Sequence, residues 1–173
     1  MSGPTAKLLV VMDGQRVVIR ACGRASFTCS ADFRRLVYHL LDRGCRDYTL
    51  ELSECTIMDS TFLGILVRFA GKLDEANGGH HKMTLRNPSP RILDLISSLG
   101  MEEYFTVTEG PVPLAMPSRE VASPEGENDK AEATRVALEA HEALMEANPD
   151  NVPRFKDVTR FLAEDLKRLT GAA

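Results

Sequence analysis

Residues 55–66 read CTIMDSTFLGIL, and this stretch decides the fold because it joins a strand to a helix. It follows the predicted strand at 48–53 and starts with a short apolar run, Cys55 to Met58. From Phe62 to Leu73 the apolar stretch is too long for a strand, and Lys and Arg interrupt it at helical intervals. We therefore predict that a helix begins near Ser60, with Asp59 and Thr61 beside it at the helix N-terminus.

The polar residues at this junction have an ordinary local explanation. Asp, Ser and Thr are the usual N-cap residues of helices, so the local pattern alone favours a plain cap. Free backbone N–H groups and the positive end of the helix dipole also stabilise an anionic oxygen there, by up to about 1 kcal/mol. A phosphate on Ser60 would therefore be tolerated locally.

Upstream of the junction, the pattern predicts two strands, a helix and a third strand. The runs at 7–13 and 15–23 are β-branched and are separated by Asp13-Gly14, which indicates a hairpin. Residues 30–42 carry apolar side chains at helical spacing and are followed by a glycine. Residues 48–53 alternate as a strand does.

Downstream, the predicted helix ends at 77–79, where Asn is followed by two glycines. Residues 82–86 then predict a strand, 88–99 a third helix and 104–107 a last strand. The order β-β-α-β-α-β-α-β favours an α/β fold, in which helices pack against a mixed sheet.

The composition changes after this domain, which we place at residues 1–116. Residues 117–129 are rich in Pro, Ser, Gly and acidic side chains, which is typical of a linker. Residues 130–173 carry two apolar helical stripes separated by Asn148-Pro149, which predicts a C-terminal helical hairpin. Its apolar faces could pack on the core domain, form a homodimer with another copy, or bind a partner helix.

Composition and charge exclude several classes of protein. The chain is 43% hydrophobic and 27% charged, with a net charge of -4, which is a globular balance. It has no basic stripe for direct nucleic-acid binding. Its longest apolar runs fall short of the roughly 20 residues that span a bilayer, and its N-terminus lacks the apolar region of a signal peptide. We expect a cytoplasmic protein that does not bind a membrane.

Two motifs resemble the STAS family of domains. The sequence MDSTFLG at 58–64 is similar to the family signature D-S-[ST]-G-L-G, with Phe62 in place of the first Gly. The sequence LRNPSPR at 85–91, with LGM at 99–101, resembles the family's fourth strand, its Asn/Pro loop and its closing helix. The resemblance covers about residues 7 to 108, and it points to the bacterial anti-sigma-factor-antagonist type.

The resemblance implies a function in signal transduction. Unphosphorylated members bind an anti-sigma factor that is also a serine kinase, which frees the sigma factor and regulates transcription indirectly. Ser60 would be the phosphorylated residue, with Thr61 less favoured, and Asp59 would orient the hydroxyl. The kinase would supply ATP and Mg²⁺, and a serine phosphatase would reset the switch. The implied partner-binding surface comprises Met58, Asp59, Ser60, Thr61, Phe62, Leu63, Gly64 and Arg24.

Two departures from the family pattern concern this surface. Phe62 could alter the choice of partner or could simply pack against the sheet. The loop from Gly23 to Thr28, which should border Ser60, has no acidic residue where family members often have one. The chain therefore departs from the family pattern at the loop where the resemblance implies a contact with the kinase.

Enzymatic and metal-binding interpretations have little support. The four cysteines form no C-x-x-C pair, and no base or oxyanion hole lies near Cys55. The adjacent His80 and His81 would point apart, and His39 and His141 are isolated, so we expect no metal site. The sequence also lacks a phosphate-binding glycine loop, so we expect no cofactor and no catalysis. The alternative function is an unphosphorylated STAS scaffold that assembles a signalling or transport complex.

Overall fold

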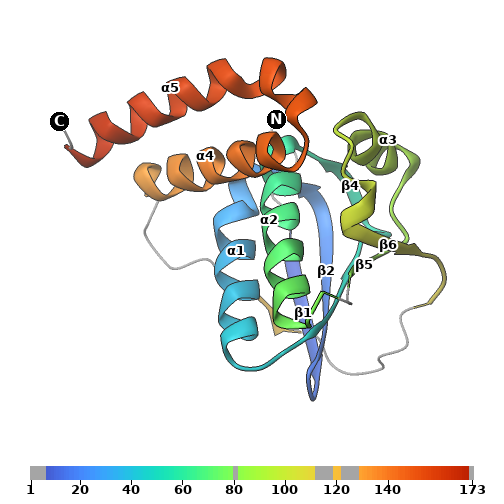
Figure 1. The fold of residues 1–173 in the computed structure, drawn as a ribbon. Helices are drawn as coiled ribbons and strands as arrows, with labels where there is room; N and C mark the ends of the chain where they lie inside the picture. The colour runs from blue at the N-terminus through green and yellow to red at the C-terminus, as the bar shows by residue number, and fades with distance from the viewer. Residues whose placement is uncertain (1–6, 80–81, 112–118, 122–128, 172–173) are drawn as a thin grey trace.

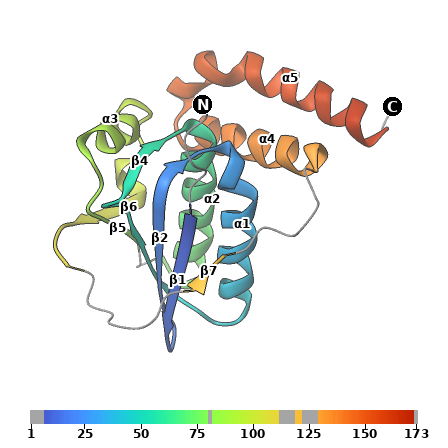
Figure 2. The ribbon, with the colours of Figure 1, turned by 180° about the vertical axis from the view of Figure 1, so that it is seen from behind.

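The computed structural model describes residues 7–79, 82–111, 119–121 and 129–171. Within these residues a mixed sheet has two helices packed along one face, and a helical hairpin lies across the end of those helices (Figures 1 and 2). This confirms the α/β fold with C-terminal helices.

The strands are β1 (Lys7–Asp13), β2 (Arg16–Ala25), β3 (Asp47–Glu51), β4 (Cys55–Met58), β5 (Met83–Arg86), β6 (Phe105–Thr108) and β7 (Arg119–Glu120). The helices are α1 (Phe27–Asp42), α2 (Ser60–Ala76), α3 (Pro90–Ser98), α4 (Lys130–Ala147) and α5 (Val152–Thr170). Short 3-10 turns lie at Glu102–Tyr104 and Pro149–Asn151.

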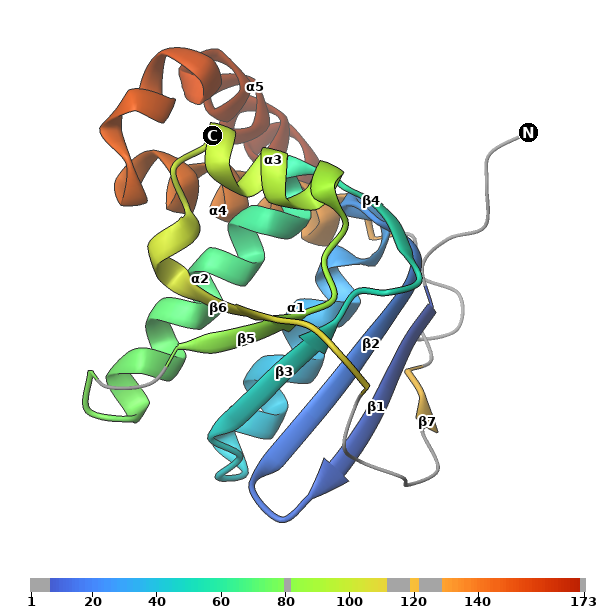
Figure 3. The same ribbon diagram turned by 90° about the vertical axis from the view of Figure 1, so that its right-hand side faces the viewer.

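The sheet order is β6-β5-β3-β2-β1-β7, with β4 paired to β2 outside that path (Figure 3). β1 and β2 are antiparallel, whereas β2, β3, β5 and β6 run parallel. β2 pairs with β3 along Arg16–Arg20 and then with β4 from Gly23, where the register shifts. Since β2 and β4 are parallel and each leads into a helix, α1 and α2 begin side by side at one edge of the sheet.

The order of elements agrees with the prediction except for two added strands. β4 is separate from β3 because it pairs with the far end of β2. β7 falls inside the predicted linker and pairs with β1. α1 also begins at Phe27 rather than Ser30, because the Ser26 side chain caps it by accepting the backbone N–H of Thr28.

The core lies between the sheet and α1 and α2. Phe33 of α1 packs against Phe62 of α2 with ring centroids 4.8 Å apart, and Tyr48 of β3 packs edge-on against Phe69 of α2 at 4.8 Å. From Thr61 to Val67 every residue of α2 is buried. A helix that is apolar all round needs a neighbour on its outer side as well as its inner side.

α4 supplies that outer neighbour. It crosses the N-terminal parts of α1 and α2, and α5 folds back over α4 on the side away from the sheet (Figures 1 and 2). Of the alternatives for the apolar faces of the tail, the structure shows α4 packed on the core domain. α5 has no buried residue. Among the described residues, no helix combines the length and apolarity needed to cross a bilayer.

Candidate functional site

Asp59 connects the starts of α1 and α2. Its Oδ1 accepts the backbone N–H of Phe62 at 2.9 Å, which caps α2, and its Oδ2 accepts the N–H of Phe27 at 2.8 Å. We expected Asp59 to orient the Ser60 hydroxyl, but both of its oxygens take backbone N–H groups instead. The loop after β2 therefore borders the start of α2, as predicted.

The Ser60 hydroxyl is held by a histidine from the tail. Its Oγ lies 3.0 Å from Nε2 of His141, and Nδ1 of the same ring lies 2.7 Å from the carbonyl oxygen of Ala137. A carbonyl only accepts, so Nδ1 carries a ring hydrogen. In the tautomer with its hydrogen on Nδ1, Nε2 accepts the hydrogen bond of the Ser60 hydroxyl.

His141 is fixed in place as well as hydrogen-bonded. Its side chain is 6% exposed, and the ring of Phe155 on α5 meets it edge-on at 5.0 Å between centroids. The α4–α5 hairpin thus presents this imidazole to Ser60 as a packed group.

α4 approaches α2 most closely at Gly64. A Cβ at this position would lie only 2.2 Å from the backbone oxygen of Ala140, so no larger residue fits without a shift of α4. Ala140 itself is fully buried, with Val136, Ala143 and Leu144 buried beside it on the same helix. Small residues on both helices allow this backbone contact.

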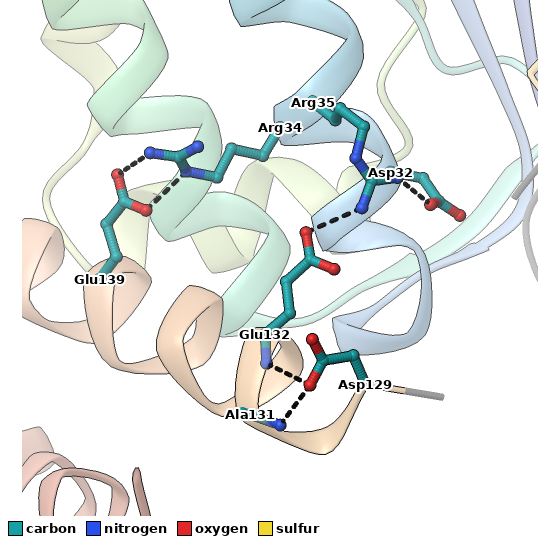
Figure 4. Close-up of polar contacts among 7 residues, drawn as sticks. All are labelled: Asp32, Arg34, Arg35, Asp129, Ala131, Glu132 and Glu139. Carbon is teal, nitrogen blue, oxygen red and sulfur yellow. Dashed lines mark hydrogen bonds and ion pairs between the residues drawn. The ribbon is translucent and has the colours of Figure 1, made fainter. Parts of the chain in front are cut away.

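Ion pairs flank the apolar contact (Figure 4). Arg34 of α1 pairs with Glu139 at 2.6 Å, and Arg35 of α1 pairs with Glu132 at 2.7 Å. The hydrogen bond that Arg34 donates to Glu139 holds the pKa of the guanidinium above its usual value. On the other side, Arg68 of α2 donates to Glu146 at 2.8 Å. The basic residues thus lie on α1 and α2, and their acidic partners lie on α4.

The turn between α4 and α5 is fastened to the end of α3. The Asn151 amide, 1% exposed, donates to the carbonyl oxygens of Leu99 at 3.0 Å and Leu144 at 2.9 Å. Asn148 packs against Gly100, where a Cβ would lie 2.4 Å from its Nδ2. The hairpin is therefore held at its turn as well as along α4.

The predicted partner-binding residues differ in accessibility. Arg24 is exposed, and Asp59 and Ser60 are partly exposed. The side chains of Met58, Thr61, Phe62 and Leu63 are buried, and Gly64 lies under α4. Phe62 packs in the core against Phe33, which is one of the two outcomes considered for it. A contact between these residues and a partner stays a prediction.

The structure adds two residues that the sequence does not single out at this surface. Phe27 is 62% exposed, and its backbone is bonded to Asp59, so it adds an open aromatic ring beside the Ser60 site. His141 is isolated in the sequence, yet in the fold it is buried against Ser60. Its one local signal is its place among the small residues of the α4 face that packs on α2.

The described residues contain no group of three His, Cys, Asp or Glu side chains placed to hold a metal ion. His80 and His81 lie outside the described residues. His39 is exposed on α1.

Comparison with known families agrees with this geometry. Residues 8–109, more than half of the chain, match the family model described as the Mlab STAS domain. The chain belongs to the STAS domain family. The resemblance seen in the two motifs is thereby confirmed. Helices α4 and α5, and with them His141, lie beyond the matched STAS range.

Solved structures similar to this chain share little sequence identity with it. A Thermotoga maritima protein assigned as an anti-sigma factor antagonist is 16% identical, with a TM-score of 0.53 over 58% of this chain and 85% of that one. The anti-sigma factor antagonist SpoIIAA in its unphosphorylated form is 20% identical, with a TM-score of 0.49 over 58% and 86%. The phosphorylated form from Bacillus is 22% identical, with a TM-score of 0.48 over 59% and 90%. No curated protein sequence matches the chain.

Proposed function

We propose that this STAS domain is an anti-sigma-factor antagonist and that phosphorylation of Ser60 switches its binding to an anti-sigma factor with serine kinase activity. The observation that carries the proposal is the position of Ser60. It is the first residue of α2, it is partly exposed, and it stands at the sheet edge where both core helices begin. The protein is then a cytoplasmic, non-enzymatic regulator that acts on transcription through its partner.

The physical basis of the switch is local charge. A phosphoserine adds about -1.5 to -2 charge at neutral pH, next to the Asp59 carboxylate. A kinase that docks on Arg24 and on the exposed ring of Phe27 would reach Ser60 with its own ATP and Mg²⁺. After transfer, like-charge repulsion and the cost of desolvating the phosphate would expel it, and a phosphatase would restore binding.

The direct test mixes the full chain with a candidate serine kinase of the anti-sigma type, ATP and Mg²⁺. We expect mass spectrometry to locate one phosphate on Ser60, and none on the same peptide of Ser60→Ala. We also expect Ser60→Asp to lose binding to the kinase while Ser97→Asp, an exposed control on α3, keeps it. A protein that carries no phosphate at Ser60 or Thr61, or a Ser60→Asp variant that binds as the wild type does, would refute the proposal.

The same measurements identify the alternative function. The hydroxyl of Ser60 is already bonded within the folded chain, which suits a STAS scaffold that works without modification. In that case Ser60→Ala and Ser60→Asp assemble equally well with their partners.

A further inference from the structure

We propose that α4 occupies the STAS docking surface in cis and that α4 docking and a phosphate on Ser60 exclude each other. This proposal rests on the proposed function in taking Ser60 as the modified residue. It goes further by assigning the C-terminal hairpin as a competitor that covers the switch.

The surface of α1 and α2 that α4 covers fits only a helix with particular side chains. Its centre is Gly64, which admits only a backbone or a very small residue at that point. Around it the basic side chains Arg34, Arg35 and Arg68 meet acidic residues of α4. A partner helix that used the same surface would need a small residue in the middle and acidic residues at its flanks.

A phosphate does not fit under the docked helix. The Oγ of Ser60 and Nε2 of His141 are 3.0 Å apart, so with Ser60 in this rotamer a phosphorus in place of the hydroxyl hydrogen would collide with the imidazole. The ring is held in place, because Nδ1 is bonded to the carbonyl oxygen of Ala137 and the ring of Phe155 packs against it. The backbone of α4 also contacts α2 at Gly64. To make room for a phosphate, the whole of α4 therefore has to move away from α2.

Phosphorylation also removes the bond that joins the two residues. The Ser60 hydroxyl hydrogen is replaced by phosphorus, and the ester oxygen then has nothing to donate to Nε2. The Ser60–His141 hydrogen bond is therefore lost, and this loss adds to the steric conflict.

Exclusion of this kind is reciprocal. If a phosphate on Ser60 lowers the affinity of α4 for the surface of α1 and α2, a docked α4 disfavours phosphorylated Ser60 by the same free energy. Release of α4 uncovers Gly64 and the three arginines. The covered half of the docking surface is then open only when the hairpin has left, whereas Arg24 and Phe27 are exposed throughout.

The test needs no kinase. The full chain is made with phosphoserine incorporated at position 60, and compared with the unmodified chain and with phosphoserine at Ser97 as a control. Hydrogen exchange of residues 130–147 is followed by mass spectrometry. We expect exchange at least about tenfold faster with phosphoserine at 60, equivalent to about 1.4 kcal/mol, and no change with phosphoserine at 97. Exchange in β3 should stay constant in all three, which shows that the STAS fold remains intact.

A pair of α4 variants calibrates this measurement. Ala140→Arg cannot fit against Gly64 and gives the exchange rate of an undocked helix, whereas Ala133→Arg on the exposed side of α4 should behave as the wild type. Phosphoserine at 60 should add little to Ala140→Arg. Unchanged or slower exchange of α4 with phosphoserine at 60 overturns the proposal, because the phosphate is then accommodated beneath the helix. The proposed function fails on a different result, namely that the kinase leaves Ser60 unmodified.

Discussion

Replacing Gly64 by alanine should release α4 without weakening the domain beneath it, and the matched change at Gly71 should not. Both glycines lie in α2, where alanine is favoured by about 1 kcal/mol through helix propensity. At Gly71 a Cβ meets nothing within 4 Å, so only the gain in helix propensity remains. At Gly64 the Cβ would lie 2.2 Å from the oxygen of Ala140, so α4 must retreat by about 1.2–1.8 Å to reach ordinary contact.

The size of this effect follows from the contacts that are lost. Overpacking of this kind costs about 1–3 kcal/mol, and loss of the hydrogen bond between Ser60 and His141 adds about 1 kcal/mol. A decrease of about 2–4 kcal/mol in the docking free energy makes the amides of α4 exchange roughly 30- to 1,000-fold faster. Hydrogen exchange measured by mass spectrometry should show this in Gly64→Ala alone, with β3 unaffected. Equal protection of α4 in the two variants, or loss of protection in β3 together with α4, would refute the reasoning.

Other perturbations test the remaining interactions. Asp59→Ala should lower the free energy of unfolding by about 2 kcal/mol in urea titrations, because the N–H groups at the starts of α1 and α2 lose their acceptor. Asp59→Asn keeps one acceptor oxygen, so its free energy of unfolding should fall by less. Glu139→Gln should weaken α4 docking by only about 0.5 kcal/mol, since the pair with Arg34 is partly exposed, and a double-mutant cycle with Arg34→Gln should shrink in 1 M salt. Burial raises the pKa of the Cys22 and Cys29 thiols from 9.0 to about 11. Their alkylation in the native chain, mapped by mass spectrometry, should be slow at pH 8 and rise toward pH 11. The stability that the protonated thiols contribute is present below pH 9 and is lost as the pH rises through 11.

The start of α2 could be predicted from sequence because its causes are local. Asp59 precedes a long apolar run, and the N-cap preference of Asp acts within the first turn of the helix. The separation of β3 from β4 depends instead on which strand each one pairs with. β4 meets β2 beyond a register shift at Gly23, and no local pattern at Cys55–Met58 specifies that partner.

The hydrogen bond between Ser60 and His141 joins residues 81 positions apart, so no spacing rule could suggest it. A weaker signal was nevertheless present. The run from Phe62 to Val67 leaves α2 without a polar outer face, and such a helix requires a cover. Residues 130–147 offered an amphipathic helix with small residues, but several surfaces could have received it. Only the packing shows that Gly64 meets Ala140 and thereby brings His141 to Ser60.

Magnitudes decide whether the helix N-terminus or α4 governs a phosphate on Ser60. The helix N-terminus favours the phosphate by at most about 1 kcal/mol, and solvent and salt reduce that contribution further. Docked α4 opposes it with the displaced imidazole and the lost hydrogen bond, which together amount to about 2–4 kcal/mol. A STAS domain without such a tail would accept the modification at little structural cost. In this chain the opposing effect of α4 exceeds the favourable effect of the helix N-terminus, so the proposed phosphorylation is expected to open the molecule as well as to change its charge.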